Sequence, residues 1–311
     1  MQTVITTSPA EAARFVKEGG VVAFPTETVY GLGANVFDEA AVRKIFEAKQ
    51  RPADNPLIAH VGHADQIGLL ADEIPPTASS FIARFFPGPL TIVMRKRPEV
   101  PDAATSGLDT IGVRMPGEEI TRRFLQECGT PVVAPSANIS GRPSPTTWQA
   151  VLEDLDGRID CVLQGDPARF GLESTVVDCA VDPPVVLRPG AVSLEELREV
   201  VPETIAPGDI GNDAPKSPGM KHKHYSPGAK VMVLGETTPP AEFNCAYIGI
   251  SEPPFECELV RRCPSVEEYA GALFGFFREC DRKGIALIYC QPVPEEGIGA
   301  ALMDRIRRAA E

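Results

Sequence analysis

The sequence predicts an α/β protein with two sheet-containing units joined by a linker. Three observations predict this organisation. Short apolar strands alternate with amphipathic helices over residues 1–206, a stretch rich in Gly, Pro and Asp covers residues 207–229, and strand and helix patterns resume over residues 230–311. The order of elements in the first unit favours a sheet of mixed direction.

Apolar spacing and capping residues predict the helices of the first unit. In the first helix Ala12, Phe15 and Val16 share one face, and Gly19 ends it. Asp38 is placed to cap the second helix. Helices are expected over residues 9–18, 38–49, 76–86, 148–155 and 193–200. Strands are expected over residues 21–24, 57–61, 90–94, 110–114, 131–134, 161–164, 174–178 and 185–188.

The C-terminal unit has strand patterns at residues 230–234, 245–250 and 285–291, and helix patterns at residues 265–282 and 298–310. Strands that alternate with helices predict a small parallel sheet of Rossmann-like character. The unit lacks a GxGxxG turn, so the sequence assigns it no dinucleotide.

Composition narrows the class of protein. The chain has 30 Lys and Arg against 43 Asp and Glu, a net charge of −13, which argues against general nucleic-acid affinity but leaves room for a local cationic pocket. Its eight cysteines form no CxxC pair, which speaks against zinc and thioredoxin-like motifs. With neither a signal sequence nor an apolar run of about 20 residues, we expect a reduced, cytoplasmic protein without membrane contact.

Three polar segments of the first unit combine turn residues, hydroxyls and cations: PTETVYGLG at 25–33, KQRPADNPL at 49–57 and SANISGRPSPT at 136–146. Such groups beside strand ends suit phosphate and carboxylate ligands. Simpler interpretations exist for two of the segments. Lys49 and Arg51 also fit a solvated helix C-terminus, and the serine-rich segment also fits a turn that caps the helix at residue 148.

Arg114 and Arg188 each stand at the end of an apolar strand and before a turn. A buried Arg requires an anion, which is either a carboxylate of the protein or a ligand carboxylate held bidentately. The repeated pattern favours one shared pocket for an anion. His60, within an apolar strand, is typical of a core histidine.

The sequence has no Ser-His-Asp order, paired-acid signature, metal-ligand spacing or GxxxxGK[ST] motif. Anion-binding groups without a proton-transfer pair suit phosphoryl or nucleotidyl transfer, where positioning and charge stabilisation dominate catalysis.

Eight ordered blocks carry a family resemblance: PTETVYGLG, KQRPADNPL, FPGPLT, GVRMP, APSANISGRPSPT, GLESTVVD, LRPG and SPGMKHKHYSP. Together they resemble the YrdC-type threonylcarbamoyl-adenylate synthases, in their longer two-domain branch. The resemblance implies a twisted mixed-sheet YrdC-like domain with a concave basic cavity. It also implies a reaction in which L-threonine, bicarbonate and ATP, with magnesium, give threonylcarbamoyl-AMP and pyrophosphate.

The resemblance also implies roles for individual residues. Lys49 with Arg51, and Ser136 with Asn138, match its catalytic signatures. Threonine contacts correspond to Thr28, His60, Arg114, Ala134 and Ser174, so for His60 the resemblance replaces the interpretation as a core residue. Nucleotide contacts correspond to Arg51, Asn55, Thr110, Ser136, Ser144, Arg188 and Tyr225. We expect the linker around residues 221–225 to close over the pocket as a lid.

The implied product serves other proteins, which transfer the threonylcarbamoyl group to tRNA, so we expect no stable direct tRNA binding. One alternative is an RNA-binding or ribosome-associated module, which predicts a basic surface. Another is a carbamoyl-transferring hydrogenase maturation factor, which predicts zinc-finger cysteine pairs that the sequence lacks.

Overall fold

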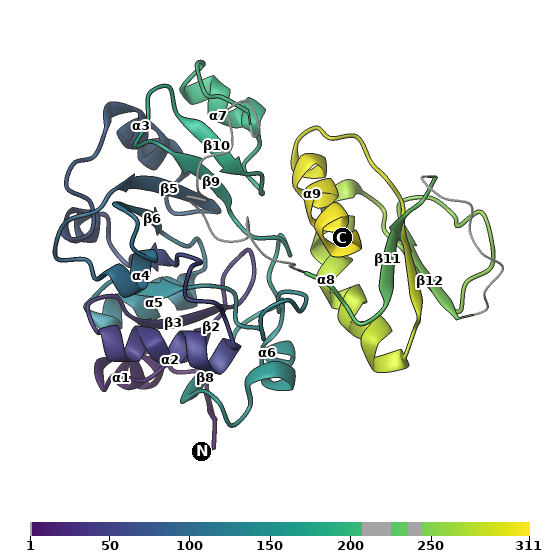
Figure 1. Ribbon diagram of the computed structural model, residues 1–311, viewed down its shortest axis with the longest axis horizontal. Helices are drawn as coiled ribbons and strands as arrows, with labels where there is room; N and C mark the ends of the chain where they lie inside the picture. The colour runs from purple at the N-terminus through teal and green to yellow at the C-terminus, as the bar shows by residue number, and fades with distance from the viewer. Residues whose placement is uncertain (1, 207–224, 236–243) are drawn as a thin grey trace.

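The computed structural model describes residues 2–206, 225–235 and 244–311. These residues form two domains, each built around its own sheet (Figure 1). The predicted α/β class and the mixed sheet of the larger domain are confirmed. Of the predicted linker, only the part from residue 225 onward falls within the described residues, and residues 221–224 of the expected lid lie outside them.

The larger sheet has ten strands in the described part of the chain. Their spatial order is β1 (Val4–Thr6), β8 (Cys161–Leu163), β2 (Val22–Phe24), β3 (Gly31–Asn35), β7 (Val132–Ala134), β4 (Ile58–His60), β6 (Thr110–Arg114), β5 (Leu90–Arg95), β9 (Thr175–Asp178) and β10 (Val185–Arg188). Strand β4 pairs parallel with β6 but antiparallel with β7. This pairing brings three segments that are far apart in the sequence to one place in the sheet.

Helices cover the larger sheet (Figure 1). They are α1 (Pro9–Lys17), α2 (Glu39–Lys49), α3 (Pro76–Phe85), α4 (Asp102–Thr105), α5 (Glu119–Cys128), α6 (Trp148–Leu155) and α7 (Leu194–Val200), with the 3-10 turn η1 (Ala64–Leu69). The side chains of Asp38 and Ser193 cap α2 and α7, as the sequence predicts. Thr147 caps α6.

Strand β3 was not predicted, because its sequence, Gly31–Asn35, contains two glycines that resemble turn residues. In the fold these glycines give space to Phe24, a buried ring on β2. A Cβ added to Gly33 would lie 2.5 Å from Val132 Cγ1 and 2.7 Å from Phe24 Cε1. The residues therefore serve close strand packing. Strands β1 and β13 and helices α4 and α5 were also absent from the prediction.

The smaller sheet has the order β11 (Lys230–Val233), β14 (Leu287–Cys290), β12 (Cys245–Gly249) and β13 (Leu259–Arg262). All of its pairings are parallel, as predicted. Helices α8 (Val266–Lys283) and α9 (Ile298–Ala310) lie between this sheet and the larger domain (Figure 1). Residues of the C-terminal domain therefore reach the larger domain from these two helices.

The two domains share an apolar interface. Val29 and Leu172 of the larger domain belong to the same buried cluster as Phe274 of α8. A Cβ on Gly171 would lie 2.6 Å from the Cα of Gly271, and Gly171 has a φ of +67°. Backbone thus meets backbone at this point, in a conformation that favours glycine.

We predict that Gly33→Ala destabilises the fold by about 1–3 kcal/mol, because the added methyl overpacks the Phe24 and Val132 side chains. Urea unfolding at neutral pH would measure the loss. The matched control is Gly68→Ala, because no heavy atom lies within 4 Å of a Cβ at that position. Equal free energies of unfolding for the two variants would contradict the prediction.

Candidate active site

One pocket gathers most of the predicted site residues. It encloses about 580 Å³ of empty space, including the part that opens to solvent. The predicted residues that line it are Thr28, Arg51, His60, Arg114, Ala134, Ser136, Ser174, Arg188 and Tyr225. Segments far apart in the sequence therefore converge on one hollow.

Sheet register explains part of this convergence. His60 at the end of β4 is the direct partner of Arg114 at the end of β6. Neighbouring residues in register project to the same face of a sheet, so both side chains enter the pocket. An isolated bridge between Gly31 and Ser136 brings the first and third polar segments together.

Arg114 has a protein carboxylate as its partner. Its Nη2 donates to Glu27 Oε1 at 2.7 Å, and both side chains are buried. Its Nη1 donates to Thr28 Oγ1 at 2.8 Å, and its Nε donates to the Gly88 carbonyl at 3.3 Å. These contacts use three of the five guanidinium N–H groups. Of the two anions that the sequence left open for Arg114, the protein carboxylate is present, and two N–H groups remain for a ligand.

Arg51 and Asn55 hold polar atoms that have no partner among the described residues. The Arg51 Nη2 donates to the carbonyls of Asn55 and Pro56, each at 3.3 Å. The Arg51 Nε and the Asn55 Nδ2 are buried without a hydrogen bond. Burial lowers the pKa of Arg51 to about 10. A buried donor without an acceptor costs about 1–3 kcal/mol, so these two atoms favour a polar ligand at this position.

Arg188 and Ser174 form the wall beside Arg51. Arg188 donates to the Ser174 carbonyl from Nε at 3.1 Å and from Nη2 at 2.9 Å. The Ser174 hydroxyl lies 2.8 Å from the Thr91 hydroxyl. These bonds fix the direction of the guanidinium before any ligand binds.

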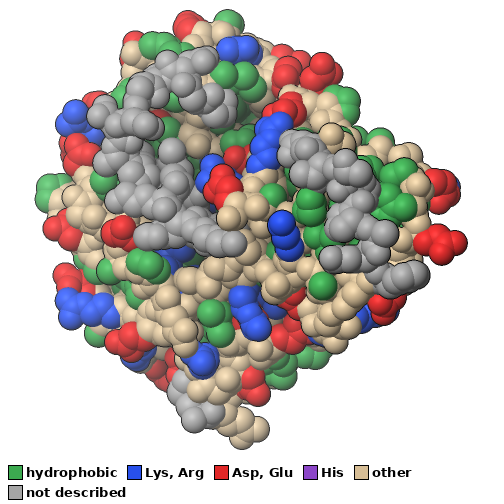
Figure 2. Space-filling model, turned by 45° about the vertical axis from the view of Figure 1, so that its right-hand side comes forward, with side chains coloured by type: hydrophobic (Ala, Val, Ile, Leu, Met, Phe, Trp, Pro, Cys, Tyr) green, Lys and Arg blue, Asp and Glu red, His purple; other side chains and the backbone are tan. Residues whose placement is uncertain are grey.

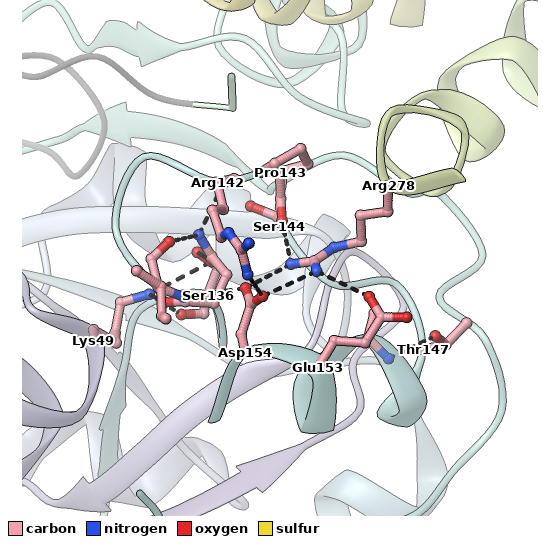
Figure 3. A network of polar contacts seen from close by, with 12 residues as sticks. Lys49, Ser136, Arg142, Pro143, Ser144, Thr147, Glu153, Asp154 and Arg278 are labelled. Atoms are coloured by element: carbon pink, nitrogen blue, oxygen red, sulfur yellow. Dashed lines mark hydrogen bonds and ion pairs between the residues drawn. The ribbon is translucent and has the colours of Figure 1, made fainter. Parts of the chain in front are cut away.

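Lys49 does not line the pocket, and its catalytic role stays a prediction. It lies beneath the serine-rich segment, where its Nζ donates to the Ser136 carbonyl and, at 2.6 Å, to the Asn138 carbonyl (Figure 3). Only 1% of the residue is exposed, so the alternative of a solvated helix end is wrong. Burial, then the nearby charge of Arg51, lowers its pKa well below the usual value. Lys49 holds the segment in place.

Asn138 completes the same support. The Ser136 hydroxyl donates to Asn138 Oδ1 at 2.6 Å. The Asn138 amide donates to the carbonyls of Ile139 at 2.8 Å and Arg142 at 2.9 Å. Since these bonds use the side chain within the segment, Asn138 orients Ser136, which lines the pocket.

Two further predicted residues lie beside the pocket. Thr110 lines an adjoining small hollow that shares Ile58 with the pocket. The Ser144 hydroxyl donates to Glu173 Oε1 at 2.5 Å. Glu173 itself lines the pocket. Burial alone would raise the pKa of Glu173, but the charges of Arg305 and Arg188 outweigh burial and lower it.

His60 is a neutral imidazole. It is buried, its Nδ1 lies 3.0 Å from the Ile58 carbonyl, and its ring packs edge-on against Phe24 at 5.5 Å between centroids. Burial, together with the nearby charge of Arg114, lowers its pKa to about 3. The residue is therefore both packed in the core and exposed to the pocket.

Comparisons with known proteins show the family of this chain. A protein-family model named for Sua5, YciO and YrdC and described as "Telomere recombination" matches residues 14–190. A second model, described as the C-terminal domain of threonylcarbamoyl-AMP synthase, matches residues 192–311. The chain belongs to the Sua5/YrdC family. Its two-domain organisation is that of the longer members.

Two relatives that match nearly the whole chain are named threonylcarbamoyl-AMP synthase. The threonylcarbamoyl-AMP synthase of Pyrococcus abyssi is 46% identical, over 96% of this chain and 93% of the relative. That of Bacillus subtilis is 38% identical, over 97% and 92%. The crystal structure of Pyrococcus abyssi Sua5 complexed with L-threonine has a TM-score of 0.92 and 42% identity, and the match covers 99% of this chain and 98% of that one.

Sequence reasoning missed several polar residues around the Sua5/YrdC-family pocket: Thr26, Glu27, Asp154, Glu173, Arg278 and Arg305. Glu27 and Glu173 lie inside blocks that carried the resemblance, so their position was a usable signal. Arg278 and Arg305 lie on α8 and α9 and meet the larger domain 124 and 132 residues away. No local pattern signals such a contact.

We predict that His60 makes the fold sensitive to acid. Its pKa is about 3 in the folded chain and about 6.5 when unfolded, so the unfolded state binds more protons between these values. The free energy of unfolding should therefore fall as the pH drops from 6.5 to 3, by up to about 4 kcal/mol from this residue. His60→Gln should show a shallower loss in urea unfolding across this range. Parallel pH curves for the two proteins would contradict the prediction.

Proposed function

We propose that this protein is an L-threonylcarbamoyladenylate synthase, which forms threonylcarbamoyl-AMP and pyrophosphate from L-threonine, bicarbonate and ATP. One observation carries the proposal: cations suited to a nucleotide and a polar cluster suited to an amino acid line the same pocket. The names of the full-length relatives support it. The product would serve proteins that modify tRNA, in the cytoplasm.

Threonine would bind in the part of the pocket lined by Thr28, His60, Arg114, Ala134 and Ser174. The two remaining N–H groups of Arg114 suit the substrate carboxylate, while Glu27 fixes the guanidinium from behind. His60 stays neutral and adds no charge beside the substrate amine. The crystal structure of Pyrococcus abyssi Sua5 complexed with L-threonine supports an amino-acid site in this fold.

ATP would bind in the part lined by Arg51, Ser136, Arg188 and Tyr225. The unpartnered Nε of Arg51 suits a phosphate oxygen, and Asn55 offers a second buried donor. Ser144 and Thr110 border this region. Together these residues give the concave cavity its cationic character, in an otherwise acidic protein.

Magnesium would belong to the nucleotide. The described residues contain no group of three or more His, Cys, Asp or Glu that could hold a metal ion. Glu173 lines the pocket, but its two oxygens already accept hydrogen bonds from Ser144 and Arg305. The described side chains thus do not fit a metal site of their own.

The proposed chemistry has two steps. The amine of threonine attacks CO₂ derived from bicarbonate, loses a proton and becomes a carbamate. A carbamate oxygen then attacks the α-phosphorus of ATP, the bond from that phosphorus to the bridging oxygen breaks, and pyrophosphate leaves. Arg51 and Arg188 stabilise the charge on the phosphates, and the Ser136 segment, held by Lys49, keeps the α-phosphate in line.

The RNA-binding alternative has less support. Among the described side chains on the face in Figure 2, basic and acidic residues are interspersed. A net charge of −13 opposes general affinity for a phosphate backbone.

None of the helices described in the structure is long and apolar enough to cross a membrane.

Leaving out each substrate in turn tests the proposed reaction. We expect pyrophosphate and a threonylcarbamoyl-AMP mass only when ATP, L-threonine and bicarbonate are all present. Pyrophosphate release without threonine would contradict the proposal. L-serine should replace threonine with a lower kcat/KM, because it lacks one methyl group. The decrease should correspond to about 1–3 kcal/mol of transition-state binding.

Arg51→Ala should reduce turnover by about 100-fold or more, because charge stabilisation at the phosphates is lost. The free energy of unfolding should change by less than about 1 kcal/mol, since within the described part of the chain Arg51 bonds to two carbonyls, each at 3.3 Å. Arg43→Ala is the matched control, an exposed arginine on α2 that pairs with Glu39. Equal losses of turnover in both variants would contradict a role for Arg51 at the phosphates.

A further inference from the structure

Arg305 of the C-terminal helix α9 stands directly behind one wall of the pocket. It has 0% exposure, although it is a charged residue. Its Nε donates to Glu173 Oε2 at 2.8 Å, and its Nη2 donates to the Pro189 carbonyl at 3.0 Å. Its guanidinium carbon lies 5.4 Å from the centre of the Tyr225 ring. One side chain thus connects three separate segments.

Each of these contacts is made with a residue in or next to the part of the pocket proposed for ATP. Glu173 and Tyr225 line the pocket, and Pro189 follows the pocket residue Arg188. Through Glu173, the contact extends to the Ser144 hydroxyl. A shift of the Arg305 guanidinium would therefore displace Glu173, Tyr225 and the backbone next to Arg188 at the same time.

Arg278 of helix α8 acts in the same way on the serine-rich segment (Figure 3). Its Nη2 donates to the Pro143 carbonyl at 2.7 Å and to Asp154 Oδ2 at 2.8 Å. Asp154 accepts from the backbone N–H of Ile139 at 3.2 Å and from Arg142 at 2.6 Å. The segment that carries Ser136 and Ser144 is thus fixed from the C-terminal domain as well as by Lys49.

The threonine part of the pocket is held differently. Arg114 bonds to Glu27, Thr28 and Gly88, and the His60 ring bonds to the Ile58 carbonyl. All of these partners belong to the larger domain. Among the described residues, the contacts of Arg305 and Arg278 with the larger domain therefore reach Glu173, Pro189, Pro143 and the helix α6, and not Arg114 or His60.

We infer that Arg305 and Arg278 are positioning residues for ATP, which makes the C-terminal domain a part of the nucleotide site. The inference rests on the proposed synthase function. A buried ion pair contributes little net stability compared with apolar packing, so the pairing of Arg305 with Glu173 is better explained by the geometry that it imposes. Neither arginine lines the pocket. Arg305 bonds to Glu173, which does, and Arg278 bonds to Pro143, in the segment that carries Ser136 and Ser144.

Steady-state kinetics of Arg305→Lys tests the inference. Lysine keeps the charge beside Glu173 but cannot also donate to Pro189 and lie flat on Tyr225. We expect the KM for ATP to rise about tenfold, while calorimetric binding of L-threonine in the absence of ATP changes less than about twofold. The control is Arg307→Lys, because Arg307 pairs with Glu295 within the C-terminal domain. It should leave both quantities unchanged.

A double-mutant cycle separates positioning from general loosening. Arg305→Lys and Ser144→Ala should each raise the KM for ATP. The increase in the double variant should be smaller than the product of the two separate increases, because both side chains hydrogen-bond to Glu173. Fully multiplicative effects, an unchanged KM for ATP, or an equal loss of threonine binding would overturn the inference. If Arg305→Lys fails to fold, Arg305→Met combined with Glu173→Gln removes both charges and tests the same split. A wild-type protein that forms no adenylate would instead overturn the proposed function.

Discussion

Cationic side chains removed from water surround the pocket, and each must find oxygen acceptors there. Lys49 satisfies this requirement with the carbonyls of Ser136 and Asn138, which fixes the serine-rich segment. Arg114 satisfies it with Glu27, and Arg305 with Glu173. The loops of the site are therefore held by hydrogen bonds and ion pairs within the protein itself. Such preorganisation favours charge stabilisation at a reacting phosphate.

The sequence predicted the strands and helices that have clear apolar patterns and caps, and it predicted the convergence of residues such as Arg51 and Arg188 on one pocket. It failed at β3, where glycines that resemble turn residues make room for Phe24. It also did not show that Lys49 is buried against carbonyls, because residue type at a helix end does not reveal whether the ammonium group meets solvent, a ligand or carbonyls. Contacts from Arg278 and Arg305 depend on how two domains pack, which local patterns do not encode.

For Arg114 and His60, the structural and the functional interpretation of the sequence are compatible. Arg114 is paired with a carboxylate of the protein, yet it still lines the pocket. His60 is a packed core residue, yet it also lines the pocket. In both cases the side chain lies at the end of a strand, where one side meets the core and the other meets the hollow. A residue at such a strand end can pack in the core and line the pocket at the same time.

The contact between Gly171 and Gly271 also limits how the molecule moves. Two backbones that touch leave no space for a side chain or a layer of water, so the joint cannot act as a hinge without being pulled apart. Substrate entry by a swing of one domain away from the other is disfavoured at this joint. A motion that admits or releases a ligand while keeping this contact has to take place within one of the two domains.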